Sequence, residues 1–266
     1  MAAPGGPDPA AGDSADPEVE VEALTPTIVL PEPEALELLA HGELTVEGRL
    51  VDASNATLYC AVTLEGVTGA CVYKPEAGER PLWDFPDGTL AGREVAAYTV
   101  SASSGWDVVP PTVLRDDGPF GGGMAQLWID ADEDVDMRRV SREWAEPLRR
   151  LAVFDAVINN ADRKGGHLLP VAGAHLYAVD HGVTFHIEDK LRTILWHWAG
   201  DPLDPDHEAV LLELRAALDA ELGATLRGLV TGGEVRAVRR RIDRLLAAGC
   251  FPEPSGEWPA TPWPPW

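Results

Sequence analysis

The pattern of apolar and polar positions divides the chain into a first half that predicts strands and a second half that predicts helices. In the first half, short apolar runs are separated by segments rich in Asp, Asn, Gly and Thr. Runs of this length, bounded by turn-forming residues, predict an antiparallel meander and then a further hairpin. The predicted strands are Leu44–Val51, Leu58–Leu64, Ala70–Lys74, Thr112–Leu114 and Met124–Ile129.

Helical spacing of apolar residues predicts two early helices and longer helices after the strands. Thr89 is expected to cap the second early helix, because threonine oxygens accept from free amides at helix starts. Apolar residues recur at three- and four-residue spacing in the later patterns. This order predicts an α+β fold with two lobes, a small antiparallel β N-lobe and a mainly helical C-lobe. The predicted helices are Ala35–His41, Thr89 to about Ser103, Met137–Phe154, Glu208–Leu222 and Glu234–Ala248.

Composition divides the chain into four segments. Residues 1–24 are rich in Ala, Pro, Gly, Asp and Glu and carry little to bury, which predicts disorder. The acidic stretch Asp130–Asp136 indicates a linker between an N-lobe over 25–132 and a C-lobe over 133–250. The tail, 251–266, holds six prolines and three tryptophans and cannot form a regular helix. We expect this tail to pack back across the helical lobe; the alternative is an extended recognition segment.

The charge and the cysteine content limit what the protein is expected to bind and where it is expected to be located. The chain has 44 acidic and 21 basic residues, a formal charge of −23, which argues against nucleic-acid binding. Its three cysteines show no CxxC spacing, so neither a disulfide framework nor a structural zinc site is expected. The sequence shows neither a signal peptide nor an apolar run of about 20 residues. We therefore expect a cytoplasmic protein with no membrane insertion.

Two short loop sequences carry the candidate chemistry. Asp162 follows a long helical pattern and precedes a Gly-Gly pair, which allows close approach of the backbone to a ligand. Asp180 follows a short apolar strand, His175–Val179, and begins an Asp-His-Gly string, after which Val183–Phe185 is expected to resume the strand, so that the two loops could form the ends of one hairpin. One carboxylate could orient or deprotonate an acceptor hydroxyl, while the other could hold a magnesium ion that bridges phosphates. The alternative is structural, because Asn, Asp and Gly are also common in helix caps and turns.

These loops resemble those of a known kinase superfamily. Phe154-Asp-x-x-Ile-x-Asn160-x-Asp162-Arg163 and Ala178-Val-Asp180-x-Gly-x-x-Phe are similar to the catalytic and metal loops of the phosphatidylinositol 3- and 4-kinase superfamily. The similarity extends to type II 4-kinases, HipA-like kinases and an actinobacterial kinase-like group. It implies a protein-kinase-like fold with ATP and magnesium as cofactors.

The resemblance also assigns roles within the two loops. It implies that Asp162 and Arg163 are catalytic and that Asp180 is a metal ligand, helped by His167 or Asn160. His167 stands where these kinases have asparagine. Because imidazole binds magnesium less readily than oxygen does, this difference implies a single metal, manganese or weakened catalysis.

The same resemblance assigns roles in the N-terminal half. Lys74 ends a strand as the phosphate-binding lysine does, and Glu94 occupies the helix whose glutamate pairs with that lysine. A buried ammonium needs such a partner, although an edge-strand lysine that reaches solvent is the structural alternative. The remaining candidates are Ser54 and Asn55 for the phosphate-covering turn, and Gln126, Leu127 and Trp128 for the adenine-binding strand.

The predicted function is ATP-dependent phosphate transfer to a hydroxyl of a protein or a small cytosolic molecule. The His167 difference leaves a second hypothesis, a nucleotide-binding pseudokinase that acts as a regulatory module. A third hypothesis is a metal-dependent hydrolase built on His181, His186 and His197, but their spacing does not match a zinc motif. Lys190 follows the second loop and is predicted either to select the acceptor or to lie on the solvated surface.

Overall fold

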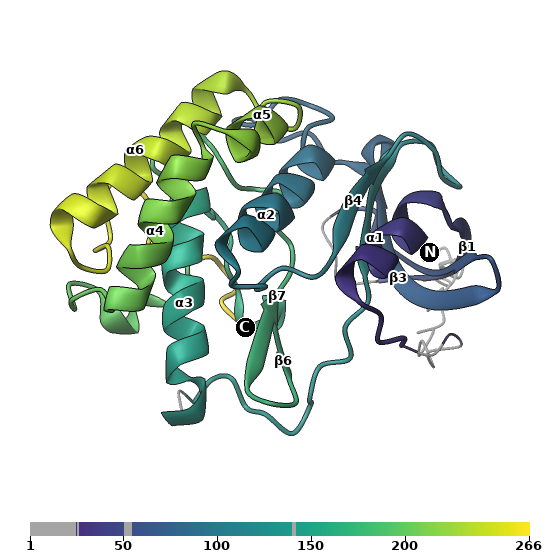
Figure 1. Ribbon diagram of the computed structural model, residues 1–266, viewed down its shortest axis with the longest axis horizontal. Helices are drawn as coiled ribbons and strands as arrows, with labels where there is room; N and C mark the ends of the chain where they lie inside the picture. The colour runs from purple at the N-terminus through teal and green to yellow at the C-terminus, as the bar shows by residue number, and fades with distance from the viewer. Residues whose placement is uncertain (1–24, 26, 51–54, 140–141) are drawn as a thin grey trace, which may run out of the picture.

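The computed structural model describes residues 25, 27–50, 55–139 and 142–266, and these residues form two lobes (Figure 1). One lobe is built on a five-stranded sheet, and the other is mainly helical. The predicted α+β class and its division into a small sheet lobe and a helical lobe are therefore confirmed. The predicted disorder of the N-terminal segment concerns residues that lie outside the described part of the chain.

The sheet is antiparallel throughout and has the strand order β1-β2-β3-β5-β4. Alternate residues of β2, β3 and β5 face one side of the sheet and form a core together with the helix α1. Lys74 lies opposite Met124 near the end of the β3–β5 pair. The elements of this lobe are α1 (Glu32–His41), β1 (Glu43–Arg49), β2 (Leu58–Leu64), β3 (Val67–Pro75), η1 (Glu76–Gly78), β4 (Thr112–Arg115) and β5 (Gly123–Leu127).

The helix α2 (Leu90–Ser104) lies between the lobes (Figure 1). One part of its surface contacts β4 and β5, while its alanines and Val100 belong to the core of the helical lobe. The expected cap is wrong, because no backbone amide of the helix donates to the Thr89 side chain, whose Oγ1 accepts from Arg93 Nε at 3.4 Å instead. The carboxylate of Glu79 instead accepts from the amides of Leu90 and Ala91, at 3.2 and 2.8 Å. A negative charge also suits a helix N-terminus.

The helical lobe packs four helices around a short hairpin. The bounds are α3 (Arg142–Ile158), η2 (Gly165–His167), β6 (Leu168–Val171), β7 (His175–Ala178), η3 (Trp196–Trp198), α4 (Pro205–Ala217), α5 (Glu221–Leu226) and α6 (Gly232–Ala248). The helix expected from Met137 begins later, because Asp136–Arg139 forms a turn. The pattern predicted as one helix up to Leu222 is split into α4 and α5.

The β6–β7 hairpin joins the two candidate loops, as the sequence indicated, but its strands differ from those expected. The hairpin pairs Leu168–Val171 with His175–Ala178, so both loops leave from its open end. Val183–Phe185 does not resume the strand. Phe185 has a φ of 64°, a left-handed conformation that no extended strand accommodates.

Buried ion pairs connect the lobes. Arg93 of α2 is 1 % exposed, pairs with Glu234 of α6 at 2.7 Å and donates to the carbonyl of Thr184 at 2.7 Å. Lys190 in the helical lobe pairs with Asp84 of the sheet lobe at 2.6 Å. The Lys190 side chain is buried. It therefore neither faces an acceptor nor lies on the solvated surface, the two positions predicted from the sequence. These pairs fix the position of α2 against the helical lobe.

The C-terminal tail packs back across the helical lobe, as expected. The carbonyl of Ala260 accepts from the amide of Thr193 at 3.0 Å and from the indole of Trp196 at 2.9 Å. Phe251 is buried in the helical core, whereas Trp263 remains exposed. The tail therefore contributes to the lobe although it has no regular structure.

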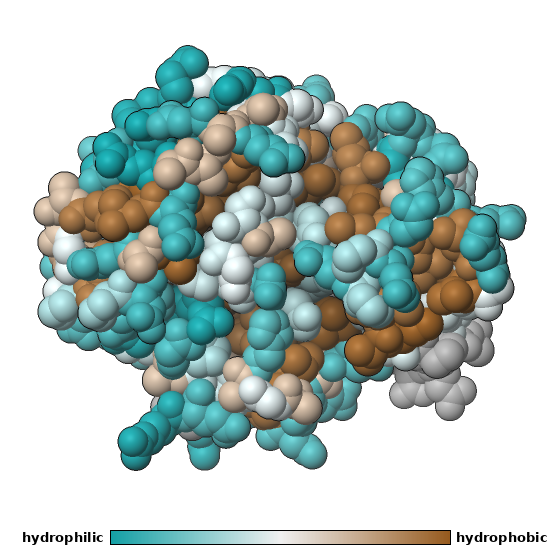
Figure 2. Space-filling view, in the orientation of Figure 1, coloured by the Kyte–Doolittle hydropathy of each residue, from teal (hydrophilic) through white to brown (hydrophobic). Residues whose placement is uncertain are grey.

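The surface is largely hydrophilic. Figure 2 shows polar side chains over much of one face, with apolar patches on both lobes. Among the residues described, no helix is both long and apolar enough to cross a membrane.

Replacement of Arg93 by alanine should destabilise the fold strongly. The change leaves Glu234 buried without its partner, and breaking a buried pair in this way costs about 3 to 5 kcal/mol. Urea denaturation followed by circular dichroism measures the loss. Arg139→Ala is the control, because that side chain is exposed and its ion pair is worth at most about 1 kcal/mol. Equal losses in the two variants would show that the interlobe pair does not stabilise the fold.

Candidate active site

Three charged residues from three elements meet between the lobes. Lys74 at the end of β3 places its Nζ 2.6 Å from Glu94 Oε1 of α2 and 2.9 Å from Asp180 Oδ1, after β7. Burial by itself lowers the pKa of Lys74, but the two carboxylates outweigh it and hold the pKa above its ordinary value. The Lys74 ammonium is also the first cause of the lowered pKa of Asp180. Lys74 and Asp180 are therefore both charged at neutral pH.

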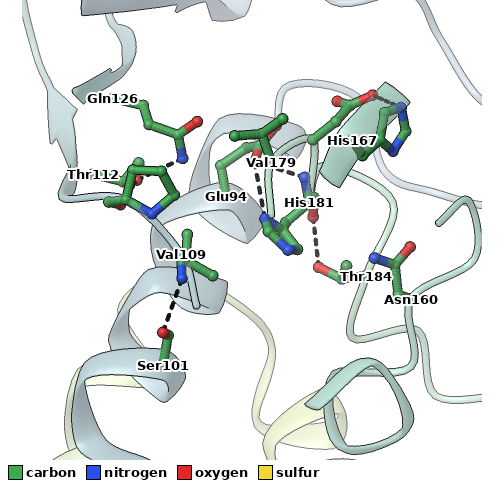
Figure 3. Close-up of polar contacts among 12 residues, drawn as sticks. Glu94, Ser101, Val109, Thr112, Gln126, Asn160, His167, Val179, His181 and Thr184 are labelled. Atoms are coloured by element: carbon green, nitrogen blue, oxygen red, sulfur yellow. Dashed lines mark hydrogen bonds and ion pairs between the residues drawn. The ribbon is translucent and has the colours of Figure 1, made fainter. Parts of the chain in front are cut away.

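Glu94 holds this arrangement with both of its oxygens. Oε1 accepts from Lys74, and Oε2 accepts from the backbone amide of His181 at 2.7 Å (Figure 3). The residue before that amide, Asp180, has a φ of 62°, which an aspartate tolerates better than a bulky residue does. The turn directs the Asp180 carboxylate toward Lys74, and it leaves the backbone amide of His181 free to donate to Glu94.

His167 faces the other oxygen of Asp180. Its Nε2 lies 3.4 Å from Asp180 Oδ2 (Figure 3). Burial lowers the pKa of His167 to about 4, with the charges of Arg163 and Lys164 acting in the same direction, so the ring is neutral at pH 7. A neutral imidazole nitrogen and a carboxylate are both able to bind a divalent cation.

These two ligands fit a cation that also binds phosphate. Within the described residues, no group of three His, Cys, Asp or Glu side chains could hold a metal ion without other ligands. Magnesium is usually bound through one or two protein ligands together with phosphate oxygens and waters. Asp180 matches that pattern, and His167 would add a nitrogen ligand, which suits manganese better than magnesium, whereas a hydrolytic zinc site would need a third protein ligand. The hydrolase hypothesis is therefore not supported by this geometry.

Asp162 lies in the loop between α3 and the hairpin. Its backbone amide donates to Asn160 Oδ1 at 2.9 Å, and its Oδ2 accepts from Lys164 Nζ at 2.8 Å. Burial raises the pKa of Asp162 above its ordinary value, although the Lys164 charge opposes the shift. Our sequence analysis did not include Lys164 as a site residue. Two features of the sequence could have indicated a role for Lys164: the chain has only three lysines, and this one lies two residues after Asp162.

Arg163 and Asn160 are buried structural residues, so the roles expected for them need correction. Arg163 is fully buried, donates to both oxygens of Asp155 and donates to the Val179 carbonyl at 2.8 Å. The amide nitrogen of Asn160 donates to Asp155 at 3.1 Å, and its oxygen is used by Asp162. Because their polar atoms are already bonded, Arg163 does not face a substrate and Asn160 is not placed as a metal ligand.

The residue that organises these bonds, Asp155, is part of the quoted motif but was given no role in the sequence prediction. It is fully buried on α3 and pairs with Arg163 at 3.0 Å. The available signal was a single acidic residue within the apolar segment Leu151–Ile158. Periodicity alone does not distinguish a buried, paired aspartate of this kind from a surface residue.

The candidates for adenine and phosphate binding in the sheet lobe are mostly occupied by internal bonds. Gln126 donates to the Thr112 hydroxyl at 2.8 Å, and the amides of Leu127 and Trp128 donate to the carbonyls of Pro111 and Ala70. Their backbone amides are thus unavailable to a base in this conformation. Asn55 accepts from the amide of Arg80 at 2.9 Å, and Ser54 lies outside the described residues.

The end of the chain lies directly on the loop that carries Asp162. The amide of Gly165 donates to the carbonyl of Pro265 at 2.8 Å. A Cβ atom at Gly165 would lie only 1.8 Å from Cε3 of Trp266. Glycine is therefore required here because the indole occupies the space of any side chain. In Figure 1 the C-terminus accordingly lies beside the β6–β7 hairpin, on the side of α3.

Comparison with solved structures identifies the class of fold. The chain is similar to a Golgi casein kinase with manganese and ADP bound, with a TM-score of 0.54 and 13% identity, covering 82% of this chain and 75% of that chain. It is also similar to the Helicobacter pylori proinflammatory kinase CtkA, with a TM-score of 0.46 and 10% identity, over 80% and 94% of the two chains. The likeness to the Golgi casein kinase shows that the two-lobed fold is kinase-like, as expected.

Comparison with curated sequences identifies the family. The chain is 45% identical over 262 residues to Protein Rv2133c of Mycobacterium tuberculosis, an alignment that covers 85% of this chain and 94% of that protein. The chain belongs to the same family as Protein Rv2133c. No protein-family model matches the sequence. The narrower assignment to the phosphatidylinositol 3- and 4-kinase superfamily remains a prediction.

Replacement of Gly165 by alanine should displace the end of the tail. The added methyl group overlaps the Trp266 ring, and overpacking of this kind typically costs about 1 to 3 kcal/mol. The same change in a Trp266→Ala background should cost clearly less, because the ring is gone. Urea unfolding of the parent, both single variants and the double variant measures this coupling. Additive losses would contradict the proposed contact.

Acidification should destabilise the protein through His181. Burial, then the charge of Arg163, lowers the pKa of this histidine well below its ordinary value, and its Nε2 accepts from Arg163 at 2.7 Å. Below about pH 6.5 the unfolded chain takes up a proton that the folded chain does not, so stability falls as pH decreases.

Urea titrations between about pH 7 and about pH 5 measure this loss of stability. His181→Gln should lose less stability over the same range, because glutamine does not titrate and its oxygen can still accept from Arg163. The same pH dependence in both proteins would contradict the assignment to His181.

Proposed function

We propose that this protein is an ATP-dependent phosphotransferase. The observation that carries the proposal is the contact of Lys74 with both Glu94 and Asp180 between the lobes, beside the loop that presents Asp162. A cation held by two carboxylates at a kinase-like cleft is suited to phosphate binding, since phosphate oxygens can share the same ammonium. The likeness to kinases supports the class of reaction, while the roles of individual residues are part of the proposal.

Lys74 and Glu94 would act on the nucleotide side. Lys74 would donate to phosphate oxygens of ATP, and Glu94 would hold Lys74 in place while its second oxygen fixes the loop after Asp180. Glu94 is therefore a positioning residue, because it touches the lysine and the loop instead of the phosphates. Because Glu94 would hold Lys74 in place, less ordering would be needed when ATP binds.

Asp180 and His167 would hold the divalent cation. When bound, magnesium or manganese would neutralise charge on the phosphates. The related Golgi casein kinase was solved with manganese and ADP, which supports the use of a divalent cation. A nitrogen ligand from His167 favours manganese more than an asparagine oxygen would.

Asp162 would orient the acceptor hydroxyl and accept its proton. Burial raises the pKa of Asp162, which makes the carboxylate a better base than an exposed aspartate. Lys164, at 2.8 Å, would fix the orientation of that carboxylate. The acceptor would be a hydroxyl of a protein or a small cytosolic molecule, and the cytoplasmic location belongs to the same proposal.

The position of His167 favours one alternative, a regulatory pseudokinase. Its ring occupies the side of Asp180 where a second oxygen ligand would be expected from the resemblance, and it lies 3.4 Å from that carboxylate. Such a protein would bind ATP with little dependence on metal and would transfer no phosphate. Nucleotide binding and phosphate transfer therefore have to be measured separately.

ATP binding should depend on Lys74 and Asp180. Charge-assisted hydrogen bonds are worth about 1.5 to 3 kcal/mol, so Lys74→Met should weaken ATP binding by about tenfold to a hundredfold. Asp180→Asn should remove the response to magnesium or manganese. Titration calorimetry with each metal provides the measurement, and Arg139→Gln, an exposed charge change, is the control. ATP affinity unchanged in both site variants would refute the proposed nucleotide site.

Loss of the Asp162 carboxylate should reduce phosphate transfer much more than it reduces ATP affinity. General-base catalysis contributes about 10² to 10⁴ in rate, and Asp162→Asn should lose transfer on that scale while ATP affinity remains near that of the parent. Incubation with γ-labelled ATP, followed by mass spectrometry of the protein and candidate acceptors, reports transfer. ATP binding without turnover in the parent protein, with either metal, would select the pseudokinase instead.

A further inference from the structure

The helix α6 carries a cluster of arginines in an otherwise acidic protein. Arg240, Arg241 and Arg244 line a surface hollow with Asp189, on the outer side of the helical lobe. The chain as a whole has a formal charge of −23, so a local excess of positive charge is unusual here. None of these arginines belongs to the Lys74 site.

Arg241 is the unusual member of the cluster because it is buried. Its side chain is 4 % exposed. Its Nε donates to the carbonyl of Val157 at 3.0 Å, and its Nη1 donates to the carbonyl of His186 at 3.1 Å. Its Nη2 has no hydrogen-bond partner, and the residue forms no ion pair with the described residues. Burial lowers the pKa of Arg241 to about 10, with the repulsion of Arg244 and Arg240 contributing.

A buried guanidinium with a spare donor is energetically unfavourable. Leaving a buried donor unsatisfied costs about 1 to 3 kcal/mol, and more for a charged group. Folded proteins satisfy nearly all such groups with protein, water or ligand partners. A residue of this kind at the wall of a groove therefore indicates a site for an anion.

The groove next to Arg241 has room for a small organic molecule. Its volume is about 390 Å³, within the lower range of ligand sites. Arg241 and Arg244 form one part of its wall, and Leu191, Trp196 and Leu245 provide apolar surface. The site thus combines cationic donors with a flat aromatic side chain.

No carboxylate that the structure describes around the groove forms an ion pair with Arg241, although the charge of Asp189 opposes the lowering of the Arg241 pKa. Asp189 is bound to Arg244, with Oδ1 2.8 Å from Nη2. Asp243 lines the adjoining hollow but pairs with Arg215 at 2.6 Å, and the exposed Glu253 lies at the rim. Asp189 is consequently the group with which an incoming anion would compete.

We propose that this groove binds a small organic anion, whose carboxylate or phosphate group pairs with Arg241 and Arg244 while its apolar body lies against Trp196. Two guanidinium groups suit such an oxyanion, because their planar N–H groups match pairs of oxygens. The bound anion would replace Asp189 on Arg244 and would reach Nη2 of Arg241 through a shift of the Arg241 side chain, because this nitrogen has almost no accessible surface. The site is separate from the residues assigned to ATP, so its test does not depend on kinase activity.

The test is titration calorimetry of the full chain with phenyl phosphate, benzoate and inorganic phosphate. We expect phenyl phosphate or benzoate to bind with a dissociation constant of about 1 mM or tighter, and inorganic phosphate to bind more weakly because it lacks an apolar body. Arg244→Gln should weaken binding at least about fivefold, on the scale of one charge-assisted hydrogen bond. Asp189→Asn should strengthen it, because the competing charge is removed.

Arg236→Gln is the matched control. Arg236 is exposed on the same helix, does not line the groove and carries the same charge, so its removal changes net charge equally. Arg244 is also exposed, and circular dichroism will show whether both variants keep the fold. Equal affinity in the parent, Arg244→Gln and Arg236→Gln proteins would overturn the proposal, as would the absence of binding by both organic anions.

Discussion

The buried charge of Lys74 is the constraint on which the candidate site depends. An ammonium removed from water must be compensated, and the compensation comes from Glu94 on α2 and Asp180 after β7. The two carboxylates lie on different elements, so the charge balance exists only when the sheet, α2 and the hairpin are in their observed positions. The charge of Lys74 is therefore compensated only when the two lobes are arranged as observed.

A second buried network holds the helical side of the site. Asp155 bonds Arg163 and Asn160, Arg163 bonds Val179 and His181, and the amide of His181 bonds Glu94. The bonds therefore run from α3, through both loops, to α2. Buried networks of this kind give rigidity, because each member loses a partner if another moves. Rigid support is what a reaction between two bound substrates requires.

The sequence predicted the residues at the centre of the site better than the residues that support them. Lys74, Glu94, Asp162, His167 and Asp180 lie where loops and strand ends place polar groups near one another, and their patterns are readable along the chain. Arg163 and Asn160 belong to the same motif, yet they point into the protein and bond Asp155. A motif gives residue types and spacing, while the direction of each side chain depends on packing by distant segments.

The sequence by itself determined the order of strands and helices and the loops that carry the carboxylates, because periodicity and turn residues act over short distances. Only the tertiary structure decided the contacts made across long separations. Lys74 and Asp180 are 106 residues apart, and the end of the tail covers Gly165 of the loop. The spare donor of Arg241 also became visible only there. Such contacts depend on how buried surfaces fit together, which no local pattern encodes.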